Sequence, residues 1–245
     1  MLAERYFGKL VELLKELEET QMENINNAAG LISDAIKEGK SIFVFGCSHS
    51  AILTEEVLYR AGGLMLINPI FGPGLTLDIK PVTLTSQMER LEGYGKTLLD
   101  FSPVSADDVL IVISNSGRNA VPVEMAMEAK NRGIKVIALT SLAYSQSVSS
   151  RHSSGKRLFE LADVVLDNCC PTADAILEVE GLRERIGPGS TIAGAALMNA
   201  IMIKVVENLM KLNIEPPIYV SANLEGGEEH NRRLLGLYKS QIHYL

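Results

Sequence analysis

Two stretches of small polar residues follow apolar runs in this sequence. Residues 46–50 read GCSHS and residues 114–119 read SNSGRN, and a helical pattern begins after each. Hydroxyls, amides and the free backbone N–H groups of a helix start can hold a dianionic phosphate without a lysine. The stretches, with the Thr140-Ser141 pair, therefore predict a phosphate site. The residues expected to bind this ligand are Gly46, Ser48, His49, Ser50, Ser114, Asn115, Ser116, Arg118, Asn119 and Ser141.

The spacing in these stretches limits the kind of phosphate compound. Neither stretch has the pattern GxGxxG or GxxxxGK[ST], so a dinucleotide or a nucleoside triphosphate loses support. A small phosphorylated metabolite fits better. Each serine can instead be a helix cap, and for any single serine this role is supported as well as phosphate binding is.

Apolar runs at 41–46, 64–70, 109–114, 135–141 and 163–167 predict five strands. Helical patterns at 51–63, 83–101 and 121–133 alternate with them, and Asn119 is the expected N-cap of the third. This alternation predicts an α/β fold: a flavodoxin-like three-layer αβα sandwich around a parallel five-stranded sheet. Ligands of such sheets bind beyond the carboxyl ends of the strands, where both polar stretches fall.

The ends of the chain extend this fold with helices. Residues 1–38 have helical periodicity and form one long helix or two, residues 190–212 form an apolar helix, and residues 213–245 are a C-terminal extension. No Gly/Ser-rich linker divides the sequence. We therefore expect a single domain over residues 1–245.

Composition excludes several classes of partner. The formal net charge is −7 with both signs interspersed, so a nucleic-acid partner is not expected. The apolar run at 191–203 is shorter than the roughly 20 residues of a membrane span and contains Asn199, so neither a membrane span nor a membrane partner is expected. None of the three cysteines has a histidine at metal-ligand spacing; they are Cys47 and the adjacent pair Cys169 and Cys170. We expect a cytoplasmic protein without a metal or other cofactor.

Residues 109–141, VLIVISNSGRNAVPVEMAMEAKNRGIKVIALTS, resemble the second signature of the sugar isomerase (SIS) domain. Residues 43–53, FVFGCSHSAIL, resemble its first loop, and the resemblance covers roughly residues 25–212. Two further segments resemble most closely an uncharacterised subgroup of bacterial SIS proteins. They are residues 151–168, RHSSGKRLFELADVVLDN, and residues 221–231, SANLEGGEEHN. By resemblance to phosphoheptose isomerase-like members, the phosphate-binding hydroxyls fall on Ser50, Ser114 and Ser116, with Asn119 in place of a third hydroxyl.

The same resemblance concerns the reaction. Isomerases and lyases of this family use an acidic base, and in several a glutamate stands ten residues after the loop serine, where this sequence has Arg60. Glu56 and Glu89 are the alternative bases, although Glu56 can instead form an ion pair with Arg60 and Glu89 can be a solvated surface residue. His152, whose unperturbed pKa is about 6.5, can carry protons between sugar oxygens. The candidate catalytic residues are therefore His152, Glu56 and Glu89.

Two functions remain open from the sequence. The first is a phosphosugar isomerase, or a related lyase or deaminase, acting on a phosphorylated sugar or amino sugar. The second is a noncatalytic phosphosugar sensor, in which Arg60 marks the loss of the catalytic acid. The resemblance also implies a homodimer or homotetramer with its site near the subunit interface, and the N-terminal helix carries a leucine stripe suited to that contact.

Overall fold

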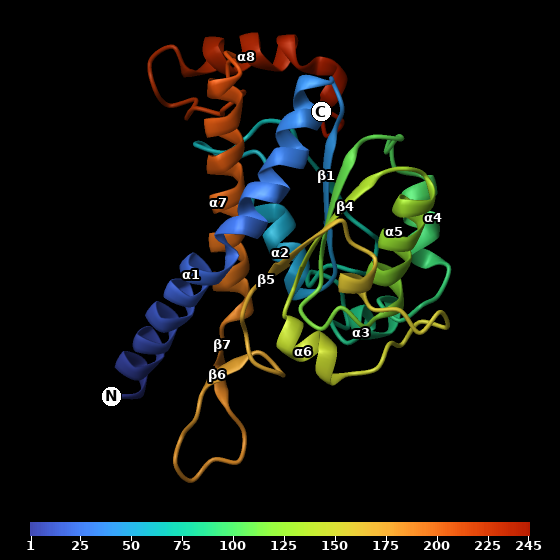
Figure 1. Cartoon of the computed structure of the whole chain (residues 1–245), viewed down its shortest axis with the longest axis vertical. Coiled ribbons are helices and arrows are strands. Elements are labelled where there is room, and N and C mark those ends of the chain that lie inside the picture. Colours follow the sequence, from blue (N-terminus) through green and yellow to red (C-terminus); the bar gives the residue numbers. More distant parts are fainter.

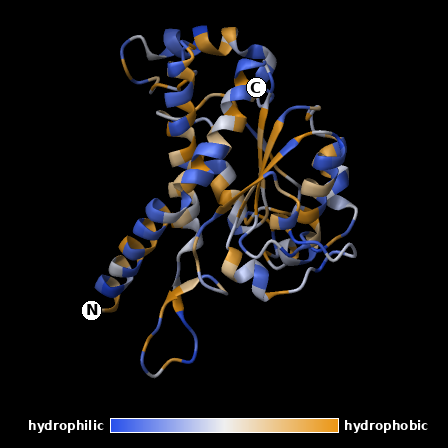
Figure 2. Ribbon diagram, in the orientation of Figure 1, coloured by the Kyte–Doolittle hydropathy of each residue, from blue (hydrophilic) through white to orange (hydrophobic).

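A computed structural model describes all residues 1–245 and contains the predicted parallel sheet. The strands are β1 (Ile42–Gly46), β2 (Ile67–Ile70), β3 (Val109–Ile113), β4 (Lys135–Thr140) and β5 (Val164–Asp167), in the order β2-β1-β3-β4-β5. All neighbours are parallel, and every residue of the central strands β1 and β3 is buried. Figure 2 shows these strands as hydrophobic ribbons, as expected for a sheet covered on both faces.

Helices cover both faces of the sheet, which confirms the three-layer α/β architecture (Figure 1). One face packs against α1 (Leu2–Lys37), α2 (His49–Glu56) and α7 (Ser190–Lys211), and the other against α4 (Tyr94–Asp100) and α5 (Ala120–Asn131). The alternation within β1 divides the core, because Ile42 and Val44 join the first cluster while Phe43 and Phe45 join the second. The remaining helices are α3 (Leu84–Met88), α6 (Leu142–Ser147), α8 (Gly227–Leu237) and two short 3-10 helices, Leu158–Glu160 and Lys239–Gln241.

The N-terminal helical region is one continuous helix of 36 residues, α1, which runs beside α7 (Figure 1). Its stripe of leucine, isoleucine and alanine side chains is buried against that helix and the sheet. With 22 residues, α7 is longer than the apolar run in the sequence, and by length and composition it reaches the limit for a membrane span. Of that apolar window, 44% is buried inside the molecule, and the buried hydrophobic residues of α7 belong to the core cluster on one face of the sheet.

A β-hairpin that the sequence did not predict precedes α7. Its strands, β6 (Ala175–Leu177) and β7 (Ile186–Pro188), pair antiparallel, and it projects from the body beside the start of α1 (Figure 1). The Tyr6 hydroxyl donates a 2.6 Å hydrogen bond to the Pro188 carbonyl. Strands of three residues give too short an alternation for detection from sequence.

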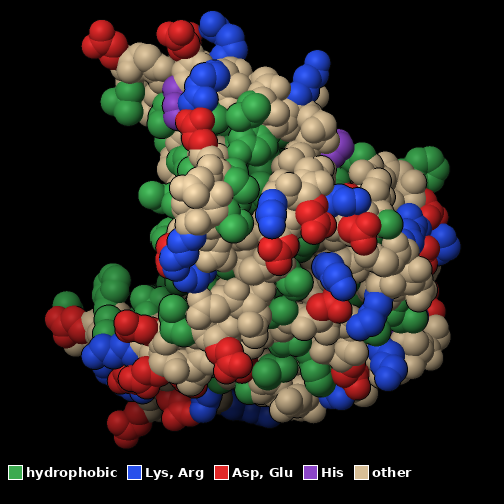
Figure 3. Space-filling view, turned by 45° about the horizontal axis from the view of Figure 1, so that its top comes forward, with side chains coloured by type: hydrophobic (Ala, Val, Ile, Leu, Met, Phe, Trp, Pro, Cys, Tyr) green, Lys and Arg blue, Asp and Glu red, His purple; other side chains and the backbone are tan.

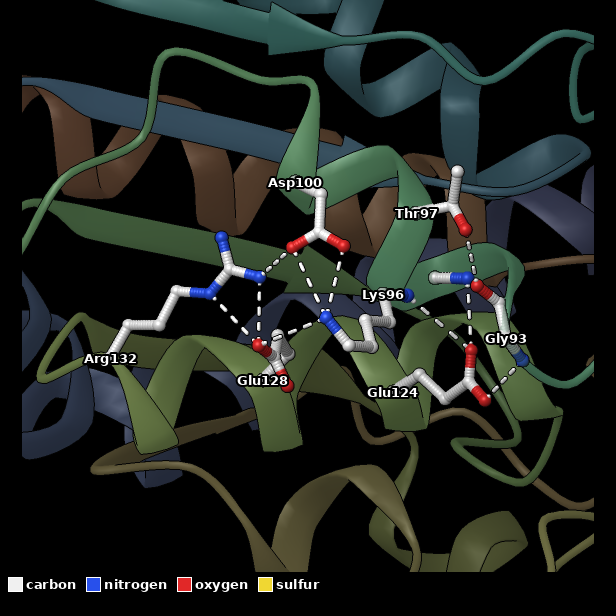
Figure 4. Close-up of polar contacts among 8 residues, drawn as sticks. Gly93, Lys96, Thr97, Asp100, Glu124, Glu128 and Arg132 are labelled. Atoms are coloured by element: carbon white, nitrogen blue, oxygen red, sulfur yellow. Dashed lines mark hydrogen bonds and ion pairs between the residues drawn. The ribbon is translucent and has the colours of Figure 1, made fainter.

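The helix predicted over 83–101 is two short helices, α3 and α4. Gly93 adopts a left-handed φ of 88°, which ends the continuous pattern. The Glu124 carboxylate of α5 accepts hydrogen bonds from the N–H groups of Gly93 (2.6 Å) and Gly95 (3.0 Å), so it caps α4 (Figure 4). A side chain from another helix thus decides where α4 begins.

The helix predicted over 51–63 starts earlier and ends at Glu56. Tyr59 has a left-handed φ of 46°, and Gly62 donates its N–H to the Tyr219 carbonyl at 2.7 Å. Met65 likewise donates to the Pro217 carbonyl at 2.8 Å. The C-terminal extension therefore takes the backbone groups that would have continued α2.

Candidate functional site

The loop between β1 and α2 turns tightly at Gly46. A side chain at residue 46 would place its Cβ 2.5 Å from the Ser50 carbonyl oxygen. The first turn of α2 therefore lies closer to this position than any residue with a Cβ would allow. Ser48 has a left-handed φ of 52°, and its N–H donates to the Leu75 carbonyl at 2.6 Å. These contacts hold Ser50 in the first turn of α2, at the carboxyl edge of the sheet.

The loop between β3 and α5 is held from the side of β4. The Asn115 carbonyl accepts hydrogen bonds from the Thr140 hydroxyl at 3.1 Å and from the Ser141 N–H at 2.9 Å. Gly117 adopts a φ of 59°, and a Cβ there would lie 2.8 Å from the Ser145 hydroxyl. The loop therefore crosses the carboxyl edge between β1 and β4 in one fixed path.

Four serine hydroxyls in these two loops make no hydrogen bond within the chain. They belong to Ser48, Ser50, Ser114 and Ser116, and all four residues are half-buried. They come from the two loops that end the adjacent parallel strands β1 and β3. In sheets of this type that edge, where the strand order reverses, is the usual ligand position.

A cavity of about 130 Å³ opens between these loops and the N-terminus of α7. Its apolar wall is formed by Leu53, Ile113 and Leu139, and its polar residues are His49, Ser50, Asn115, Asn168, Asp174, Ser190 and Thr191. Of the predicted ligand residues, the cavity brings together His49, Ser50 and Asn115. Ser48 lines a different hollow of about 570 Å³, beside residues 76–78.

Asp174 and Asn168 organise the cavity wall, and neither was predicted. The Asp174 carboxylate accepts hydrogen bonds from the Ser190 N–H (2.7 Å) and the Ser190 hydroxyl (2.8 Å), so it caps α7. Asn168 donates its amide to the Asn115 side chain at 2.9 Å. A helix cap 16 residues from its helix leaves no local sequence signal. His49 and Asp174 are the ionisable side chains that line this cavity.

The SIS domain family model matches residues 5–141, more than half of the chain and including both loops. The chain belongs to the SIS domain family. A UPF0309 protein of Shouchella clausii is 47% identical over 242 residues, covering 99% of this chain and 98% of that protein. The resemblance predicted from the two loop signatures, including that to a bacterial subgroup, is confirmed.

Solved structures share the SIS fold at low identity. Phosphoheptose isomerase GmhA of Neisseria gonorrhoeae aligns with a TM-score of 0.57 and 20% identity, covering 84% of this chain and 100% of that chain. The Vibrio vulnificus NanR protein complexed with ManNAc-6P aligns with a TM-score of 0.51 and 13% identity, covering 97% of this chain and 68% of that chain. These likenesses confirm the fold class.

Asn119 of this SIS chain occupies the N-cap position of α5, as predicted, but its side chain makes no cap hydrogen bond. Its Oδ1 accepts instead from Arg151 at 2.9 Å. The Val121 N–H of the first α5 turn donates to the Glu89 carbonyl at 3.1 Å. Segments around Glu89 and Arg151 therefore cover this helix end, on the side of the sheet opposite the cavity.

Ser141 has a structural role in place of the predicted ligand contact. It is fully buried, donates its hydroxyl to the Cys170 carbonyl at 2.6 Å and accepts from the Tyr144 N–H at 3.0 Å. This serine is the N-cap of α6. The single proton of its hydroxyl is already donated, so none is left for a phosphate oxygen.

His152 is not brought to the cavity. Its Nε2 lies 3.4 Å from the Glu124 carboxylate, its Nδ1 lies 2.8 Å from the Ser154 hydroxyl, and its side chain is 10% exposed. Glu124 belongs to α5, on the far face of the sheet. The imidazole therefore packs the segment after α6 against α5.

Glu56 lies outside the cavity as well. Its carboxylate forms an ion pair with Arg60 one turn later in α2 and accepts a 3.3 Å hydrogen bond from Asn199 of α7. This ion pair is the structural role that the spacing of Glu56 and Arg60 predicts as the alternative to a catalytic one. Asn199 also donates to the Ala195 carbonyl, so it satisfies a helix backbone group.

Glu89 is half-buried beside Asn119, and burial raises the pKa of its carboxyl group. A hydrogen bond from Asn119 and the charges of Arg90 and Arg151 oppose this shift. Glu89 is therefore not a solvated surface residue. Burial, and secondly the charge of Glu89, raises the pKa of the Cys47 thiol, which favours a small neutral residue there over a reactive thiolate.

Proposed function

We propose that this SIS chain binds a phosphorylated sugar or amino sugar whose phosphate accepts hydrogen bonds from Ser50, Ser114 and Ser116. The observation that carries the proposal is that these three half-buried hydroxyls have no partner in the chain and flank the starts of α2 and α5. Unsatisfied donors at helix N-termini are suited to a phosphate. The phosphoheptose isomerase name of one structural neighbour and the ManNAc-6P complex of another support a ligand of this class.

The reaction proposed is aldose–ketose isomerisation or a related lyase reaction of the open-chain sugar. In isomerisation a base removes the proton from the carbon next to the carbonyl, a second proton moves between the two oxygens, and the first returns to the neighbouring carbon. Asp174 and His49 line the cavity and can exchange protons with a bound sugar. Glu89 stays a candidate base, and burial raises the pKa of its carboxyl group. His152 and Glu56 would act only after leaving their present partners.

A noncatalytic sensor is the second candidate function. Arg60 stands where several family enzymes have their glutamate, and it is paired with Glu56 rather than directed to the cavity. Binding of a sugar phosphate without proton exchange would be the behaviour of a sensor.

We also propose that residues 1–245 act as one cytoplasmic unit that associates with a second copy of itself. An apolar groove of about 220 Å³ runs between α1 and α7 and is lined by Leu14, Leu17, Met22, Ile25 and Leu197 among others. The three cysteines are free, which fits a reducing compartment. On the face shown in Figure 3, charges of both signs are mixed, without the basic stripe that nucleic acid requires.

The binding test compares wild type with the double variant Ser50→Ala/Ser116→Ala by calorimetry, using hexose, heptose and N-acetylhexosamine phosphates. Removing two hydrogen bonds to a charged ligand, each contributing about 1.5–3 kcal/mol, should weaken binding at least about 100-fold. Ser240→Ala removes an exposed hydroxyl from the C-terminal tail and is the matched control. Unchanged affinity of the double variant would refute the phosphate site.

The reaction test follows deuterium exchange at C2 of the bound sugars in deuterated water by NMR. Incorporation by the wild type and its loss in Asp174→Asn, with binding retained, supports an isomerase. Tight binding without exchange or product in the wild type instead supports the sensor.

A further inference from the structure

Three arginines surround the start of α5. Arg90 follows α3, Arg118 lies in the loop before α5, and Arg151 lies in the segment after α6. The Arg151 N–H donates to the Arg118 carbonyl at 2.8 Å, and the Arg151 guanidinium donates to Asn119 at 2.9 Å. Arg118 reaches the hydroxyl of Ser149 at 3.4 Å. Segments far apart in the sequence are thus connected at one helix end with positive side chains.

None of the three arginines has a carboxylate within 4.0 Å. The Arg118 Nε is buried and has no hydrogen-bond partner at all. By contrast, Arg132 at the other end of α5 is paired with both Asp100 and Glu128 (Figure 4). Unpaired guanidinium groups at a helix N-terminus, where the backbone is also positive, leave a positive field that no ion pair cancels.

One acid, Glu89, faces this cluster, but its carboxylate lies more than 4.0 Å from all three guanidinium groups and forms no ion pair with them. Its charge raises the pKa of Arg151, and the charges of Arg90 and Arg151 lower the pKa of Glu89, which burial raises. Burial is the largest cause that lowers the pKa of Arg151. The positive charges of Arg90 and Arg118 come next and lower it further. The three guanidinium groups therefore repel one another, and the charge of Glu89 offsets this repulsion only in part.

The cluster borders the loop that carries the free serines. Asn115 lines the cavity, and Arg118 follows three residues later, so their Cα atoms are at most about 11 Å apart. The cavity lies on the side of α2 and α7, and the arginines lie on the side of α3 and α5. A small ligand lying across the Ser114–Asn119 loop can therefore reach the cavity at one end and the arginines at the other.

We propose that Arg90, Arg118 and Arg151 form a second anion-binding subsite, so that the preferred ligand is a sugar phosphate with an additional anionic group, a carboxylate or a second phosphate. This rests on the proposed function, because the first phosphate is held by the serines. Guanidinium groups bind both kinds of anion through paired, charge-assisted hydrogen bonds. The buried Nε of Arg118 supplies one donor that the folded chain leaves unused.

The test measures binding of glucose 6-phosphate, 6-phosphogluconate and glucose 1,6-bisphosphate to wild type and to the double variant Arg90→Gln/Arg151→Gln. In wild type, at least one of the two ligands with an extra anion should bind at least 10-fold more tightly than the monophosphate. The double variant should lose this preference to within about threefold, with its monophosphate affinity unchanged. The carboxylate and bisphosphate arms identify which anion the subsite takes.

Arg183→Gln/Arg232→Gln is the matched control, because it removes the same charge from two exposed arginines without ion pairs, in the β6–β7 hairpin and in α8. It should retain the preference. Arg151→Lys, which keeps the charge but not the paired donors, tests the geometry if the double variant is unstable, and it should reduce the preference at least threefold.

The outcomes separate the two proposals. Equal binding of all three ligands to wild type, or a preference that survives in the arginine variants, overturns the subsite alone. A preference that needs the arginines, together with affinities that are unchanged in Ser50→Ala/Ser116→Ala, retains the subsite and overturns the serine phosphate site. Failure of all three ligands to bind overturns both.

Discussion

The carboxyl edge of the sheet has different chemistry on its two sides. On the side of α2 and α7, neutral hydroxyls and amides surround a cavity with one carboxylate, Asp174, which caps α7. On the side of α3 and α5, three arginines without carboxylate partners gather around Asn119. The strands bring both loops to one edge, but loop residues on each side of the sheet supply the charges.

This difference indicates how a ligand would be oriented. Neutral donors and a carboxylate are suited to sugar hydroxyls and to proton transfer, whereas arginines are suited to anions. The free serines of the Ser114–Asn119 loop lie between the two sides. A sugar phosphate with an additional anionic group would therefore bind with that group on the arginine side.

The largest effect on the cavity side is expected from Gly46→Ala. A Cβ 2.5 Å from the Ser50 carbonyl forces the first turn of α2 to move, which should lower the free energy of unfolding by about 3 kcal/mol and abolish phosphosugar binding. Urea unfolding and calorimetry measure both. Gly8→Ala in α1, where no atom lies within 4 Å, should instead stabilise the chain by up to about 1 kcal/mol. Equal behaviour of the two variants would show that the tight turn is unimportant.

Asp174→Ala should lower the free energy of unfolding by about 2 kcal/mol, because α7 loses both a cap and a negative charge at its N-terminus. Asp174→Asn keeps an acceptor for the Ser190 N–H and should cost about half as much. Urea unfolding of both variants distinguishes these contributions. A loss as small for Ala as for Asn would mean that the cap does not hold the cavity wall.

On the arginine side, Glu89→Gln should change the pH dependence of stability. Because the folded state raises the pKa of Glu89, the folded chain binds its proton more tightly than the unfolded chain. Stability contributed by this group is then present below the unfolded pKa of about 4.3 and is lost as pH rises through the folded value. The melting temperature of the variant relative to wild type should therefore be more favourable at pH 7 than at pH 4. The opposite trend would place Glu89 in a stabilising ion pair with the arginines.

The smallest effect concerns the thiols. Cys47 is 7% exposed and burial raises the pKa of its thiol; burial also raises the pKa of Cys169 to about 11 and that of Cys170 to about 12. At pH 8 a disulfide reagent should modify the folded chain at least about 100-fold more slowly than the urea-unfolded chain, because little thiolate is present. A fast-reacting Cys47 would show that the loop between β1 and α2 opens readily.

Local sequence pattern was enough to predict the sheet. The strands β1, β3 and β4 are continuous apolar runs. Because helices alternate with them along the chain, the sequence predicts a parallel sheet with right-handed crossovers. Helix ends were predicted less well. α2 stops at Glu56 because the C-terminal extension binds its following backbone, and α4 begins where Glu124 of α5 caps it. Partners distant in sequence leave no periodic signal.

The sequence by itself determined that hydroxyls and amides end the strands at one edge, since strand and loop are encoded by adjacent residues. Only the tertiary structure decided which of them stay free. Ser116 and Ser141 both follow buried strands in the sequence, yet the Ser141 hydroxyl is taken by the carbonyl of Cys170, 29 residues later, whereas that of Ser116 has no partner. Asp174 and the convergence of Arg90, Arg118 and Arg151 likewise depend on segments that meet only when the layers pack.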